Sequence, residues 1–71
     1  MSIGQAISIL AEENNISKYP ISKNSGIPQT TLSDIVNERN TNPTIETIEK
    51  IATGMGITAS EIIKKAEELG E

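Results

Sequence analysis

The fold is decided by the stretch Ile21-Ser22-Lys23-Asn24-Ser25-Gly26-Ile27-Pro28-Gln29-Thr30-Thr31-Leu32-Ser33-Asp34-Ile35. Gly26 supplies the left-handed conformation that commonly ends a helix. Pro28 follows it, and proline is pre-set for the first turn of a helix. The stretch therefore predicts two short helices, over residues 18–25 and 28–37, joined by a tight turn that contains glycine.

The start of the first of these helices carries two further signals. Ser17 can cap it, because serine is a favoured residue at the N-cap. Pro20 falls at its third position, where the missing N–H costs little because first-turn donors have no partner within the helix.

Helical patterns continue on both sides of this pair, over residues 2–14, 44–54 and 58–69. Ser2 with Gln5, and Thr58 with Glu61, have the spacing of capping boxes at two of the helix starts. No strand-like alternation persists along the chain. The expected fold class is all-α, five short helices in a single domain that spans residues 1–71.

The helix over residues 44–54 is predicted from its cap and its apolar spacing. Thr44 caps it, and Ile45, Ile48 and Ile51 fall on one side with Ala52. The group Gly54-Met55-Gly56 is expected to break it.

The core must be aliphatic. The chain has 13 Ile, 3 Leu and 1 Val, with a single Tyr and no Phe or Trp. Single-strand binding by stacking bases on aromatic rings is therefore disfavoured. The residues expected to meet in one core are Ile7, Leu10, Ile27, Leu32, Ile35, Ile48, Ile51 and Ile62.

Composition also disfavours catalysis. The sequence contains no Cys and no His, which removes thiolate metal ligands and the commonest general base. A chain of 71 residues leaves little room for a substrate pocket. We expect no enzyme activity, no metal site, no cofactor and no small-molecule substrate. No apolar run reaches the length of a membrane span and no signal peptide is visible, so we expect a cytoplasmic protein without a membrane partner.

The two helices around Gly26 have the geometry of a helix-turn-helix, whose second helix enters the major groove of DNA. The stretch from Ile21 to Ile35 resembles the phage repressor and Cro helix-turn-helix family, the lambda-repressor-like domains. Residues 42–52 and Met55-Gly56-Ile57-Thr58 resemble the segment that closes the core of that family. The resemblance covers about residues 3–66.

The resemblance implies a compact five-helix domain that regulates transcription, a small phage-type repressor from a bacterium or its phages. Its partner would be double-stranded DNA with a palindromic operator, bound by a homodimer. Gln29 takes the family's main base-contact position, where Gln can pair with adenine N6 and N7. The other DNA-binding positions implied are Thr30, Thr31, Ser33 and Asp34 on or beside the same helix face, Lys18 on phosphate, and Asn37, Arg39 and Asn40 in the following loop.

Charge keeps an alternative open. The chain has 6 basic and 10 acidic residues, a net charge of −4. Residues 17–44 carry a net +1 and the remainder −5, and the first helix lacks the basic residue that the family often uses to reach phosphate. The alternative is a protein-interaction module, an anti-repressor or partner-binding protein, that keeps the fold with weak or no DNA binding.

A second alternative concerns Gly54-Met55-Gly56, which resembles the hairpin of a helix-hairpin-helix module. The small residue that such a module needs in the next helix would fall on Ser60, and basic residues around the hairpin are missing.

Overall fold

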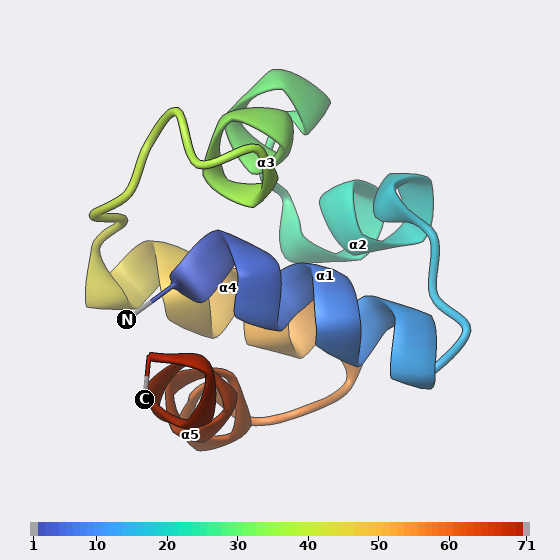
Figure 1. The fold of residues 1–71 in the computed structure, drawn as a ribbon. Coiled ribbons are helices and arrows are strands. Elements are labelled where there is room, and N and C mark those ends of the chain that lie inside the picture. The colour runs from blue at the N-terminus through green and yellow to red at the C-terminus, as the bar shows by residue number, and fades with distance from the viewer. Residues whose placement is uncertain (1, 71) are drawn as a thin grey trace.

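Residues 2–70, apart from the side chain of Lys18, are described by a computed structural model. Five helices follow one another along this part of the chain, which contains no strand (Figure 1). The prediction of an all-α fold is confirmed, and the predicted helix ranges agree with the structure to within one or two residues at each end. The helices are α1 (Ile3–Glu13), α2 (Lys18–Ser25), α3 (Gln29–Val36), α4 (Ile45–Met55) and α5 (Ala59–Leu69).

Three helices begin at a side-chain cap, as predicted. In each, the hydroxyl of the N-cap residue accepts a hydrogen bond from an N–H three residues later, which satisfies a first-turn donor. These bonds join Gln5 N to Ser2 Oγ at 3.2 Å, Thr47 N to Thr44 Oγ1 at 3.2 Å, and Glu61 N to Thr58 Oγ1 at 3.3 Å.

The starts of α2 and α3 differ from the prediction. Ser17 is the N-cap of α2, but its side chain makes no capping hydrogen bond. The reason is that Pro20 occupies the third helical position. Proline has no N–H that could donate a hydrogen bond to the Ser17 hydroxyl. Pro28 is the N-cap of α3 and not its first residue, so α3 begins at Gln29.

The group Gly54-Met55-Gly56 ends α4 as predicted, since the helix runs to Met55 and Gly56 is its C-cap. Gly56 has a φ of +75°, and the next N–H, that of Ile57, donates to the oxygen of Ala52 at 3.0 Å. Gly54 stays helical because it lies against α2. A Cβ at Gly54 would lie 2.7 Å from the carbonyl oxygen of Ile21. A glycine is therefore needed for α2 and α4 to approach this closely.

All eight predicted core residues are buried in one cluster, which confirms that prediction. The cluster also contains residues that were not singled out: Ile3, Ala6, Ile21, Ala52, Met55 and Ala66. Ile45 is the exception on α4, since 59% of it is exposed, although it was expected on the same side as Ile48. It is the first residue of α4, and this turn borders an open hollow beside the loop that precedes it.

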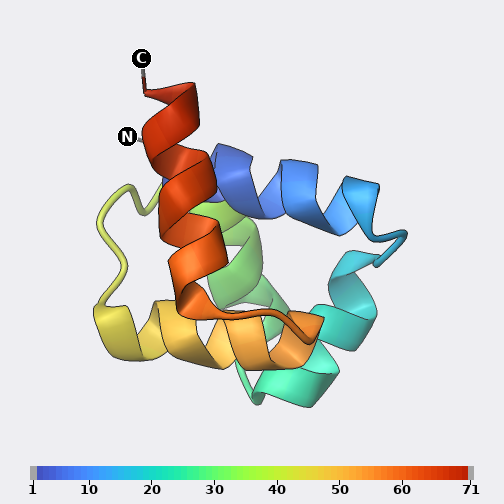
Figure 2. The same ribbon diagram turned by 90° about the horizontal axis from the view of Figure 1, so that it is seen from below.

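The five helices pack so that α3 and α5 lie at opposite ends of the molecule (Figure 1). α2 packs against α4, and α1 packs against both α3 and α5. Figure 2 views the molecule from the side of α5, with α5 lying across α1 and α4 and α3 behind them. The acidic residues of α5 are thus held away from α3.

Candidate nucleic-acid interface

The turn between α2 and α3 is fixed by hydrogen bonds from two serines. Gly26 has a φ of +78°, and its N–H donates to the carbonyl oxygen of Ser22 at 3.1 Å. The hydroxyl of Ser22 donates to the carbonyl oxygen of Ile27 at 2.5 Å. The hydroxyl of Ser25 donates to the oxygen of Ser22 and accepts from the N–H of Ile27, both at 3.2 Å. These bonds set the direction in which α3 leaves the turn.

α3 buries one face and exposes the other. Leu32 and Ile35 are fully buried and anchor the helix in the core. On the opposite face, Gln29, Thr30 and Asp34 are exposed and Ser33 is half-buried. Polar side chains with both donors and acceptors therefore point outward from the second helix of the pair.

This exposed face is hollowed. Four residues of α3 and one residue of the next loop line a shallow depression of about 390 Å³, and all five are predicted site residues: Gln29, Thr30, Ser33, Asp34 and Arg39. The structure thus gathers most of the predicted base-contact residues into one feature.

The other predicted site residues do not line the depression. Thr31 is half-buried at the side of α3. Asn37 caps the end of α3, where its N–H donates to the oxygen of Ser33 at 2.8 Å. Asn40 uses its amide oxygen within the loop, accepting from the N–H of Asn42 at 3.1 Å. The side chain of Lys18 lies outside the described residues.

Asp34 and Arg39 form an ion pair at the edge of the depression. Arg39 Nε donates to Asp34 Oδ1 at 3.0 Å, although both side chains are more than half exposed. Between them in sequence, Glu38 has a φ of +62°, which turns the chain sharply at the end of α3. The carboxylate of Glu38 accepts a hydrogen bond from the hydroxyl of Ser2 at 3.1 Å.

Three of these features could not be read from the sequence alone. The serine bonds depend on the exact path of the turn. Nothing in the sequence indicates the left-handed conformation of Glu38, because Gly or Asn is the usual residue at such a position. The only hint of the ion pair is that Asp34 and Arg39 lie five residues apart with opposite charges.

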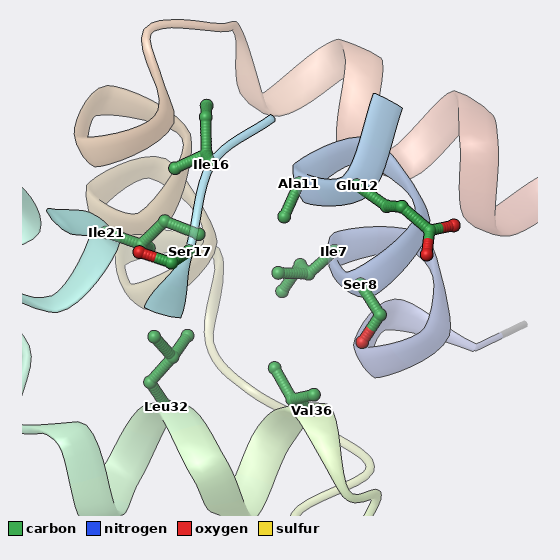
Figure 3. Close-up of a pocket in the computed structure, with 9 residues that line it drawn as sticks. All are labelled: Ile7, Ser8, Ala11, Glu12, Ile16, Ser17, Ile21, Leu32 and Val36. Atoms are coloured by element: carbon green, nitrogen blue, oxygen red, sulfur yellow. The ribbon is translucent and has the colours of Figure 1, made fainter. Parts of the chain in front are cut away.

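A second hollow lies behind α3 and is apolar. It measures about 230 Å³ and lies between α1, α3 and the start of α2. Figure 3 shows Ile7 and Ala11 pointing toward it from α1, and Leu32 and Val36 reaching it from α3. It holds no set of metal ligands, since residues 2–70 contain no cluster of three or more His, Cys, Asp or Glu side chains placed to bind an ion.

Comparison with known protein families gives one match. Residues 7–62 match the pattern of the family described as Helix-turn-helix, and the match includes all of α2, α3 and α4. The chain belongs to the phage repressor and Cro-type helix-turn-helix family. This confirms the resemblance inferred from the sequence. A comparison with curated proteins finds no match.

The helix-turn-helix family is a DNA-binding regulatory family. Within this family, α2 and α3 are the motif itself, and α3 is the helix that a motif of this kind places in the major groove. Between residues 2 and 70, none of the helices has the combined length and apolar character that crossing a membrane requires.

Proposed function

We propose that this protein is a sequence-specific transcriptional regulator, a small repressor of phage type that acts by occupying its operator. The observation that carries the proposal is the depression on α3. Gln29, Thr30, Ser33, Asp34 and Arg39 line it together, and their amide, hydroxyl and charged groups are those that hydrogen-bond base edges in the major groove. Gln29 has the strongest role, because its amide can pair with adenine in two hydrogen bonds.

Phosphate contacts would come from the elements around α3. The starts of α2 and α3 have no side-chain cap, which leaves first-turn N–H groups to meet phosphate oxygens. Lys18, Asn37 and Asn40 stand at the edges of the same motif and would add contacts that orient the protein without reading sequence.

The proposed assembly on DNA is a homodimer. Few basic side chains surround α3, so one subunit can neutralise few phosphates. A second subunit doubles the number of phosphate contacts and of base contacts. Ile45 supports this step, since it is 59% exposed and lines a hollow of about 380 Å³ with Pro43 and Ile63. This hollow adjoins the loop after α3. Two subunits that meet there would read two half-sites about one helical turn apart.

Selection of bound duplexes from a random pool at low salt tests the proposal. The expected result is an enriched, roughly palindromic sequence with half-sites about 10 base pairs apart. Binding to that sequence should be at least about a thousandfold tighter than binding to a scrambled duplex of the same composition.

The net negative charge supports a competing function, a protein-interaction module. The net charge is −4, which disfavours binding to a polyanion. This feature favours a protein-interaction module over a DNA-binding one. If no duplex is enriched at low salt, the repressor proposal is wrong and the interaction module takes its place.

A further inference from the structure

Asp34 is the one acidic residue among those that line the depression on α3. A carboxylate at a DNA surface repels phosphate, so its presence there needs an explanation. We propose that Asp34 is a positioning residue that holds the guanidinium of Arg39 toward the groove, so that Arg39 reads a guanine. This inference rests on the proposed function. It adds the base that is read, guanine, and assigns reading to Arg39 and positioning to Asp34.

The main support is that Asp34 holds Arg39 at both its backbone and its side chain. The carbonyl oxygen of Asp34 accepts from the N–H of Arg39 at 2.8 Å and from the N–H of Asn40 at 2.9 Å. Its carboxylate accepts from Nε of Arg39 at 3.0 Å. The left-handed Glu38 makes this arrangement possible, because it folds the chain back over the last turn of α3.

The pairing leaves most of the guanidinium for another partner. An arginine side chain has five N–H donors, and Asp34 is bonded to the one at Nε. The donors at the two Nη atoms match the O6 and N7 acceptors of guanine, the commonest specific contact of arginine in the major groove. Arg39 also lines the same depression as Gln29 and Thr30, so its target would be a base pair next to theirs.

The carboxylate contributes by limiting motion. A long, exposed arginine samples many rotamers, and ordering it on binding costs conformational entropy. A guanidinium already fixed at one edge loses less freedom when its other edge binds a base. The ion pair is exposed and adds little to stability by itself, so its effect should appear in recognition and not in folding.

The test compares Asp34→Ala, Asp34→Asn, Arg39→Ala and the double variant Asp34→Ala/Arg39→Ala. Each is titrated with the selected duplex and with duplexes carrying every single base-pair replacement in one half-site. Asp34→Ala and Arg39→Ala should lose discrimination at the same G·C pair, by about 5- to 150-fold. The double variant should lose no more discrimination there than Arg39→Ala alone.

Asp34→Asn is the matched control, because its amide oxygen can still accept from Nε of Arg39 while the charge is gone. It should keep the preference for that G·C pair. Thermal melts of all four variants should agree with the wild type within a few degrees, which separates recognition from folding.

Three outcomes would overturn the inference. Equally tighter binding of Asp34→Ala to every duplex would make Asp34 a repelling charge only. Loss of discrimination by Asp34→Ala at a base pair that Arg39→Ala leaves unaffected would make Asp34 a base reader itself. Full discrimination by both variants, with a loss for Gln29→Ala, would contradict this inference and leave the proposed function standing. Failure of the wild type to bind any duplex would instead contradict the proposed function.

Discussion

The hydroxyl of Ser22 donates a hydrogen bond to the carbonyl oxygen of Ile27, at an Oγ–O distance of 2.5 Å. The bond spans the turn and joins the middle of α2 to the residue that precedes Pro28. Ser22 is half-buried and Ile27 is buried, so water has limited access to this carbonyl. Together with the bonds of Ser25, this bond therefore sets the angle at which α3 leaves α2.

Ser22→Ala should lower the free energy of unfolding by about 1–2 kcal/mol, because it leaves a poorly solvated acceptor without its partner. Urea denaturation measures the change. Ser60→Ala on the exposed side of α5 serves as the control and should stay within about 0.5 kcal/mol of the wild type. Equal effects of the two substitutions would show that the Ser22 bond contributes nothing.

Gly4→Ala should destabilise the protein more, by at least about 2 kcal/mol. The reason is steric, since a Cβ at Gly4 would overlap the carbonyl oxygen of Ile35, where α1 crosses the end of α3. Thermal unfolding by circular dichroism detects the loss. Gln5→Ala changes the exposed neighbour and should leave the melting temperature nearly unchanged. An unchanged Gly4→Ala melt would mean that α1 and α3 can separate at no cost.

Gln29→Ala should weaken binding to the selected operator by about 1–3 kcal/mol and weaken binding to random DNA much less. The side chain is proposed to contact a base edge, which only the right sequence presents. Asn37→Ala should behave oppositely and weaken all duplexes alike, because Asn37 is proposed to contact phosphate. Fluorescence anisotropy with both duplexes separates the two patterns. A uniform loss for Gln29→Ala would remove it from the base-reading role.

The salt dependence of DNA binding should be shallow. A subunit offers at most Lys18, Lys23 and Arg39 near the motif, so the slope of log K against log salt for a dimer should be no steeper than about −5 to −6. Lys18→Ala should reduce its magnitude by about 1 per subunit. Lys64→Ala, on α5 at the other end of the molecule, should leave it unchanged. A wild-type slope near −10 would place the DNA-binding surface elsewhere.

Ile45→Glu should prevent two subunits from meeting while leaving the monomer folded. Ile45 is 59% exposed, so the substitution removes little from the core and adds charge to the proposed contact. Binding to a duplex with two half-sites should fall toward the affinity for one half-site, as measured by mobility shift. Ile63→Glu offers a second variant in the same hollow. If both variants still bind two half-sites cooperatively, the dimer contact lies on another face.

The fold was largely predictable because its signals are local. Gly26 and Thr44 mark helix ends through their own backbone or side-chain chemistry, and the aliphatic spacing marks the core. Close approaches were not predictable in the same way. The group Gly54-Met55-Gly56 ends α4 as predicted, but the sequence does not indicate that Gly54 lies against the backbone of α2. This contact depends on how two helices far apart in sequence pack.

The sequence was enough to name candidate residues of the site, but not to show how their side chains are arranged. Gln29, Thr30 and Ser33 follow from the position of the turn and the period of the helix. The pairing of Asp34 with Arg39 does not, because it depends on the left-handed conformation of Glu38, which a glutamate does not indicate. The family match tests the class of the protein and leaves the role of each side chain to experiment.

The hydrogen bond from Ser2 to Glu38 places the second residue of the chain beside the loop that carries Arg39. The sequence contains no cysteine, so Ser2→Cys would introduce a single thiol for an environment-sensitive dye. Such a dye would sit next to the proposed protein–DNA boundary without occupying any residue of α3. Its emission would report binding directly in solution, and a dye on Ser60→Cys in α5 would serve as the silent reference.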